Sequence, residues 1–174
     1  MYYIPNSSYQ SPSPHSFYNQ TFYPRSYYNY GDYRVTDFGP EPFVINIEEA
    51  TKRNNMYRSA LWTGHHLQVT LMSIPVGGDI GLEIHPDTDQ FLRLEQGQGI
   101  VQMGKQQHAL NFVRHVHEND AIMVPAGTWH NVTNKGHVPL KLYSIYAPPH
   151  HPHGTVQETK AIALAEERPT YWQY

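Results

Sequence analysis

The chain has 174 residues, a formal net charge of −3 and no cysteine. This length suits one domain with additional terminal segments. The slightly acidic balance argues against nucleic acid and membrane surfaces as partners, and the missing cysteine excludes disulfides, thiolate metal sites and a cysteine nucleophile. No apolar run reaches the roughly 18–20 residues of a membrane span, and the first residues lack the pattern of a secretory signal, so a cytoplasmic location is expected.

Residues 1–40 differ in composition from the rest of the chain. They are rich in tyrosine, serine, proline and asparagine, and Ile4 and Val35 are almost their only aliphatic residues. Such a segment buries too little apolar surface to offset its ordering entropy, so we expect a disordered tail. The tail either has no specific role or, because tyrosine stacks readily, is adhesive or cross-linkable. Its composition resembles that of Tyr-rich tails of spore-coat and surface-layer proteins, which keeps a spore-coat location open.

Residues 41–148 show the pattern of an all-β sandwich or barrel. Short runs rich in β-branched and aromatic residues are separated by turn residues at intervals of roughly 8–12 positions. A short helix is predicted near residues 47–55, and a Pro/His-rich arm with a second short helix, 157–167, is predicted over residues 149–174. The predicted strands are 43–47, 57–62, 67–74, 80–85, 91–95, 100–103, 109–115, 121–124, 130–133 and 140–146.

Four polar residues in this region form a candidate metal site. Glu83 and His85 are two positions apart in a predicted strand, so their side chains project from the same face. His130 follows a Pro/Gly turn much later in the chain, and Gln90 opens the strand after His85. Two imidazoles and a carboxylate brought together in the mouth of a barrel suit a divalent first-row metal, and Gln90 would add a neutral oxygen.

The same residues belong to two sets with fixed spacing. The first set is Gly77, Glu83, His85, Gln90 and Gly97, and the second is Asn119, Pro125, Gly127, His130 and Asn134. Both spacings resemble the two motifs of the cupin superfamily, and the resemblance extends over about residues 42–167. Three positions depart from the motifs: Glu83 stands for a histidine, Gln90 for a glutamate and Asn119 for a glycine. The last change is mild, because asparagine tolerates the left-handed backbone conformation.

The resemblance implies a cupin jelly-roll β-barrel like that of the small single-domain bacterial cupins labelled "mannose-6-phosphate isomerase-like". It also implies a homodimer formed by strand exchange, and one divalent metal ion held by Glu83, His85, Gln90 and His130. This donor set favours iron or manganese, and zinc and nickel also fit it. The alternative is that the replaced residues mark a site that has lost its metal.

Three functions are compatible with these features. The first is a metal-dependent dioxygenase or isomerase acting on a small polar metabolite, with no general base identified. The second is a sugar- or metabolite-binding protein without turnover. The third is a spore-coat or surface structural protein whose Tyr-rich tail carries the function. Fold membership alone does not choose among them.

The remaining histidines are expected to have other roles. His65 and His66 are predicted in a solvated turn, and His108, His115 and His117 on an exposed hairpin. For the histidines of the Pro-rich arm we expect adventitious metal binding or dimer contacts rather than ligation; these are His150, His151 and His153. His151 is singled out because the arm can fold back over the barrel mouth.

Overall fold

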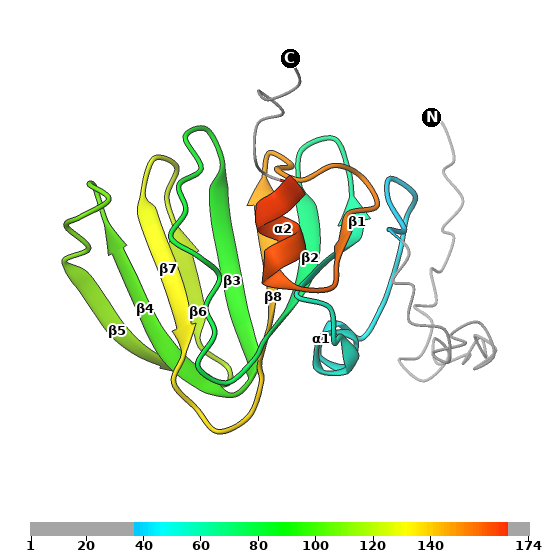
Figure 1. The fold of residues 1–174 in the computed structure, drawn as a ribbon. Helices are drawn as coiled ribbons and strands as arrows, with labels where there is room; N and C mark the ends of the chain where they lie inside the picture. The colour runs from blue at the N-terminus through cyan, green and yellow to red at the C-terminus, as the bar shows by residue number, and fades with distance from the viewer. Residues whose placement is uncertain (1–36, 167–174) are drawn as a thin grey trace, which may run out of the picture. The chain divides into compact units, whose positions relative to one another are not determined.

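The computed structural model describes residues 37–166, so most of the tail predicted over residues 1–40, namely residues 1–36, and the last residues, 167–174, lie outside the described part. Within it, two β-sheets face each other (Figure 1). The helices are α1 (Ile47–Arg53) and α2 (Lys160–Glu166). The strands are β1 (Arg58–Thr63), β2 (Gln68–Ile74), β3 (Asp89–Gln96), β4 (Gln98–Gly104), β5 (Phe112–His117), β6 (Ala121–Val124), β7 (Trp129–Asn134), β8 (Leu140–Ala147) and β9 (Val156–Gln157).

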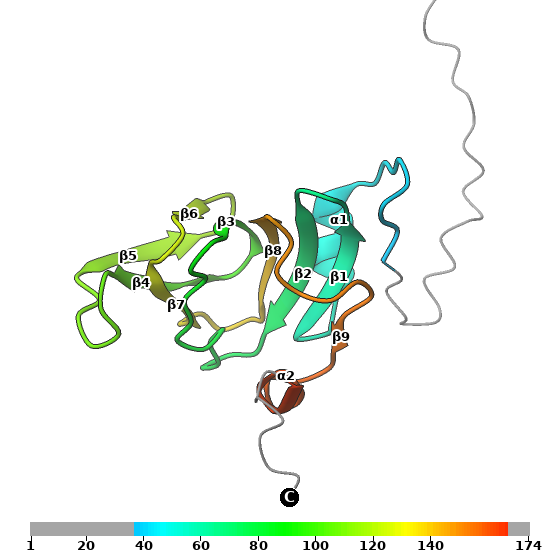
Figure 2. The same cartoon turned by 90° about the horizontal axis from the view of Figure 1, so that it is seen from above.

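The two sheets are antiparallel and differ in size. The larger has six strands in the order β6-β3-β8-β2-β1-β9, and the smaller has the order β5-β4-β7. Viewed from above, α1 and α2 lie on opposite sides of the larger sheet (Figure 2). Among residues 37–166, no helix is long and apolar enough to cross a membrane. This arrangement confirms the predicted all-β class with two facing sheets.

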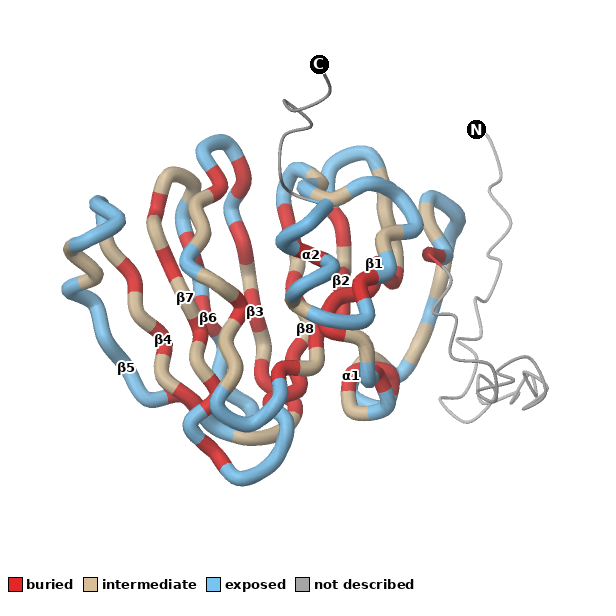
Figure 3. The backbone as a smooth tube through the Cα atoms, in the orientation of Figure 1, coloured by how far each residue is buried: buried red, intermediate tan, exposed pale blue. Residues whose placement is uncertain are grey.

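The interior between the sheets is apolar along one part of its length. On β2, β3 and β8, alternate side chains point inward, as the period of two requires. Those nearer the β7–β8 turn are aliphatic and buried (Figure 3). They join residues of the smaller sheet in one core cluster, which includes Met72, Ile74, Leu92, Leu94, Val101, Val132, Leu140 and Leu142.

Further along the same inward faces, the side chains become polar. Gln68 and Thr70 on β2, Ser144 on β8 and Gln90 on β3 are all buried. Tyr146 lies opposite both Gln68 and Gln90 in the strand register, so these three side chains share one face. The interior therefore has an apolar end and a polar end, and the polar end contains the candidate site.

Two predicted strands are absent as regular strands. Residues 43–46 form no strand in the described structure, and α1 begins at Ile47. Their alternation reflects packing instead, because Phe43, Ile45 and Ile47 contact the outer apolar cluster of Ala50, Leu61 and Leu71. Residues 80–85 run beside β7 through isolated bridges, since the ladder is interrupted near Gly81, which has a positive φ of 87°.

The folded domain begins before residue 41. Asp37, assigned above to the tail, is buried, and its carboxylate accepts hydrogen bonds from the backbone N–H groups of Gly39, Thr63 and Gly154. It also accepts a bond of 2.6 Å from the Thr63 hydroxyl. One side chain thus joins the start of the domain, β1 and the C-terminal arm, which is defined here as residues 148–155.

A second contact holds the arm against the larger sheet. The Gln68 side chain donates to the carbonyl of His151 and accepts from the backbone N–H of the same residue, both at 2.9 Å. Gln68 also donates to the Thr63 hydroxyl, which links this contact to Asp37. The arm is therefore fixed at two points across the polar end of the interior.

Candidate metal site

Strand register brings Glu83 and His130 together. Each donates its backbone N–H to the carbonyl of the other at 3.0 Å, so the two residues form a directly opposed antiparallel pair. Opposed residues project from the same face, and His85 follows Glu83 by two positions. The hydroxyl of Tyr57 supports this irregular segment by donating to the carbonyl of Ile80 at 2.8 Å.

The three side chains converge at atomic level. One ligand atom from each of Glu83, His85 and His130 lies within 4.8 Å of the other two. Oε1 of Glu83 is 3.4 Å from Nε2 of His85 and 3.2 Å from Nε2 of His130. All three atoms are buried and have no hydrogen-bond partner among residues 37–166. They face one another without pairing, which is the arrangement of ligands directed at a common ion.

These separations fit a metal ion. Bonds of about 2.0–2.2 Å to nitrogen and oxygen place neighbouring ligands of a tetrahedral or octahedral ion about 3.0–3.4 Å apart. Nδ1 of His130 lies 2.9 Å from the carbonyl oxygen of Thr128. Because a carbonyl only accepts, Nδ1 carries a proton, and this tautomer would leave Nε2 available to a metal ion. The donors present therefore fit a divalent first-row metal.

Glu83 is charged in this setting. Burial would raise the pKa of its carboxyl group, but the close imidazoles of His130 and His85 and the positive charge of Arg58 outweigh burial and lower the pKa well below its usual range. Arg58 is 1% exposed, with Nη2 3.8 Å from Oε2 of Glu83 and Nη1 donating to Gln157 at 2.9 Å. The two carboxylate oxygens thus have separate neighbours, the histidines at Oε1 and Arg58 at Oε2.

Gln90, predicted as a fourth ligand, lies on the inner face near this cluster. Its Nε2 donates to the Ser144 hydroxyl at 3.0 Å, and its buried Oε1 has no partner in the described region. Tyr146, which is opposite Gln90 in the register, has its ring 5.5 Å from that of His85. The cluster of converging ligand atoms comprises Glu83, His85 and His130, and ligation by Gln90 stays a prediction.

The C-terminal arm contributes two residues that the sequence did not assign to the site. The ring of His150 lies 4.1 Å from that of His85, and the ring of His151 lies 5.0 Å from that of Tyr146. Burial, with the charge of Arg58 and the neighbouring His150, lowers the pKa of His151 to about 3. Burial and His85 also lower the pKa of His150. The arm lies against the site, and His150, not the singled-out His151, contacts the proposed ligand His85.

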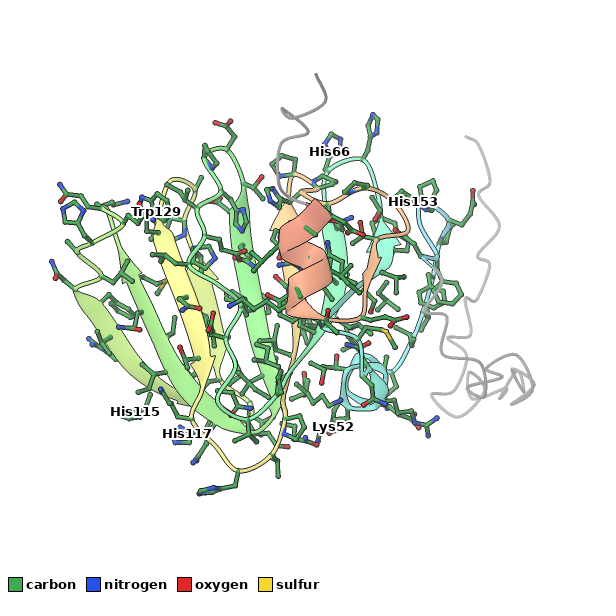
Figure 4. The ribbon with its side chains drawn as sticks, in the orientation of Figure 1. Lys52, His66, His115, His117, Trp129 and His153 are labelled. Carbon is green, nitrogen blue, oxygen red and sulfur yellow. The ribbon has the colours of Figure 1, made fainter. Side chains whose placement is uncertain are left out.

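The other predicted positions have ordinary surroundings. His65, His66, His108, His115 and His117 are exposed, as expected, and His66, His115 and His117 point away from the domain (Figure 4). Asn134 is structural, because its Nδ2 donates to the carbonyls of Ile74 and Val138. Asn119 adopts a positive φ of 73°, as expected for a residue in place of glycine.

Comparison with known proteins agrees with this architecture. The family model described as "Cupin domain" matches residues 70–146. YrkC, an uncharacterized protein of Bacillus subtilis (strain 168), is 65% identical over 143 residues, which are 82% of this chain and 77% of that protein. An uncharacterized protein of Acanthamoeba polyphaga mimivirus is 42% identical over 115 residues, covering 66% of this chain and 70% of its own. The chain belongs to the cupin family.

Solved structures show the same fold. The crystal structure of BH2720 from Bacillus halodurans has 70% sequence identity and a TM-score of 0.75, covering 75% of this chain and 99% of that one. A Klebsiella pneumoniae protein with a double-stranded beta-helix domain has 20% identity and a TM-score of 0.53, covering 68% and 100%, and shares the fold alone. The cupin fold predicted from the two motifs is confirmed, whereas the finer "mannose-6-phosphate isomerase-like" label stays a prediction.

Proposed function

We propose that this protein is a metal-dependent cupin enzyme in which Glu83, His85 and His130 hold one divalent ion and a small polar metabolite is the substrate. The observation that carries the proposal is the convergence of three buried, unpaired ligand atoms, with Oε1 of Glu83 3.4 and 3.2 Å from the two imidazole nitrogens. Without a metal, burying these atoms unpaired would cost several kcal/mol.

Between the two predicted reactions, the donor set favours dioxygenation. Two histidines and one carboxylate with open positions are the ligand set of non-haem iron(II) oxygenases, and iron or manganese suits such donors. Bound there, the ion would supply Lewis-acid chemistry and, as iron, redox chemistry. Isomerisation would need a base beside the substrate, and Glu83 is already shared between the two histidines and Arg58.

The surrounding residues have defined tasks in this proposal. Thr128 orients the His130 ring through its carbonyl, and Arg58 adds to the effect of the two imidazoles that keeps Glu83 ionised. His150 and Tyr146 place aromatic rings against His85, which limits the access of water to that ligand. These tasks concern binding and orientation, so they apply equally if the protein binds its ligand without turnover.

Elemental analysis of tag-free protein tests the proposal. We expect about one first-row metal per chain in the wild type, and little in His85→Ala or His130→Ala, because each removes an imidazole that no neighbour replaces. His66→Ala is the matched control, since it removes an exposed imidazole and should leave the metal content unchanged. Metal retained in full by both site variants would contradict the assignment.

A second measurement protects the test against misfolded variants. An ion that binds only the folded protein raises the melting temperature by mass action. Adding iron(II) or manganese to metal-free protein should therefore raise the melting temperature of the wild type and of His66→Ala. The same addition should leave His130→Asn unchanged, provided that this variant still melts cooperatively.

A further inference from the structure

Two buried polar atoms near the candidate metal site are not accounted for by metal binding. Oγ1 of Thr70 and Nε2 of His151 have no hydrogen-bond partner in residues 37–166. Thr70 is fully buried, at 0% exposure. Buried polar groups are almost always hydrogen-bonded, and an unpaired one costs about 1–3 kcal/mol. Their partner therefore lies outside residues 37–166.

The two atoms border the same part of the interior. Thr70 follows Gln68 by two positions on β2, so both side chains share the inward face. The Gln68 side chain holds His151 through both backbone groups at 2.9 Å. The ring of His151 packs edge-on against Tyr146, the residue opposite Gln68. Thr70 thus lies on the same inward face as Gln68, the residue whose side chain holds the arm.

This region adjoins the metal site. Tyr146 contacts His151 on one side, with ring centres 5.0 Å apart, and His85 on the other, at 5.5 Å. His150, which also belongs to the arm, contacts both His85 and His151 and is itself exposed. A molecule bound near the ion would meet Thr70 and His151 next.

The chemistry of the two groups indicates what they bind. A threonine hydroxyl both donates and accepts, and a neutral imidazole nitrogen does one or the other. His151 is neutral at physiological pH, because burial, Arg58 and His150 lower its pKa to about 3. The nearby cation, Arg58, is already engaged by Glu83 and Gln157. Uncharged groups of this kind match hydroxyl groups, not a phosphate or a second carboxylate.

We propose that Thr70 and His151 form a subsite for the hydroxyl groups of a small polyhydroxylated ligand bound beside the metal. This inference rests on the proposed function for the location of the site, and it adds the chemical class of the ligand. The hydroxyl groups can belong to a neutral polyol or to a hydroxy acid whose carboxylate faces the ion.

Titration of the full-length protein with three four-carbon probes tests the subsite. Erythritol carries hydroxyl groups alone, threonate carries hydroxyl groups and a carboxylate, and butyrate carries the carboxylate alone. We expect erythritol or threonate to bind and butyrate to bind at least tenfold more weakly. Erythritol binding identifies a neutral polyol site, and binding of threonate alone identifies a hydroxy acid site. Equal binding of butyrate, or no binding of either hydroxylated probe, would overturn the proposal.

Matched threonine variants identify the residue responsible. Thr70→Val removes the hydroxyl and keeps the side-chain shape, and should weaken the hydroxylated probe about tenfold, the effect of one lost hydrogen bond. Thr51→Val is the control, because Thr51 in α1 is likewise buried with an unpaired hydroxyl oxygen and should leave affinity unchanged. His151→Phe, which keeps the backbone bonds to Gln68, gives a second readout if Thr70→Val folds poorly. Equal affinity in all three variants would show that the two atoms are bridged by water only.

Metal content measured on the same samples separates the two proposals. If the wild type holds metal and no hydroxylated probe binds, the subsite fails and the metal site stands. If the wild type holds no metal and erythritol still binds in a Thr70-dependent way, the metal proposal fails and the subsite stands.

Discussion

Replacing Asp37 tests whether one carboxylate anchors the C-terminal arm. Its Oδ1 accepts from the backbone N–H groups of Gly39 and Thr63 at 3.0 and 2.9 Å. Its Oδ2 accepts from the Thr63 hydroxyl at 2.6 Å and from the Gly154 N–H at 3.0 Å. Asp37→Ala removes all four acceptor contacts and leaves the donors in place.

The structure sets the size of the effect. Hydrogen bonds to a charged group contribute about 1.5–3 kcal/mol each, and water can replace part of this loss because the donors are only partly buried. We therefore expect Asp37→Ala to lower the free energy of unfolding by about 3–5 kcal/mol. For a protein of this size, that corresponds to a melting temperature roughly 10 °C lower.

The effect should depend on pH in a defined direction. Burial would raise the pKa of Asp37, but the hydrogen bonds from Thr63, Gly154 and Gly39 and the proximity of His153 lower it. A carboxylate with a lowered pKa contributes its full stability above the pKa of the unfolded chain, about 3.9, and loses it as the pH falls through the folded value. The wild type and the variant should therefore differ fully at neutral pH and begin to converge only below about pH 4, as the pH falls toward the lowered pKa of Asp37.

Urea denaturation at pH 7 and at acid pH measures both predictions. Asp89→Ala serves as the control, because Asp89 accepts a single exposed bond from the N–H of Ala126 at 2.8 Å. It should cost about 1 kcal/mol or less. An Asp37→Ala variant no less stable than Asp89→Ala at pH 7 would refute the anchoring role.

Other predictions concern the site and the termini. Gln90→Glu should tighten metal binding in competition with a chelator if Gln90 is a ligand, because it adds a negative charge, and unchanged affinity would place Gln90 outside the donor set. Deleting residues 1–36 should leave the melting temperature and metal content within error, since their composition offers few aliphatic side chains to bury. A large loss of stability would show that the deleted residues contribute to the fold. Light scattering should give twice the chain mass of 20.1 kDa if the predicted homodimer forms, and a single chain mass would contradict it.

The alternation of apolar and polar residues predicted a strand correctly where alternate side chains point to opposite faces of a paired strand. The strand predicted over 140–146 is β8, Leu140–Ala147, because its inward residues are buried and its ends lie at turns. The same rule failed for residues 43–47, whose alternate side chains pack against an apolar cluster and which form no strand within residues 37–166. Alternation reports which side chains are buried, and it cannot report whether a neighbouring strand is available for hydrogen bonding.

The candidate site was only partly predictable for a related reason. The two-residue spacing of Glu83 and His85 and the motif position of His130 were sufficient to predict the triad. The contact of His150 with His85 depends on where the chain turns after β8, which spacing does not encode. One signal was available: Tyr146 is the last inward-facing residue of β8, so the chain leaves the sheet at the end that holds the site.

The division of the interior into an apolar and a polar end has an evolutionary consequence. The aliphatic cluster that includes Met72, Leu92 and Leu142 supplies stability through burial, and the unpaired atoms of the polar end oppose it. Substitutions at the polar end can then alter ligand preference while the aliphatic end keeps the chain folded. Because stability and function draw on different residues of the same strands, a barrel of this design can acquire new specificities without first gaining a new core.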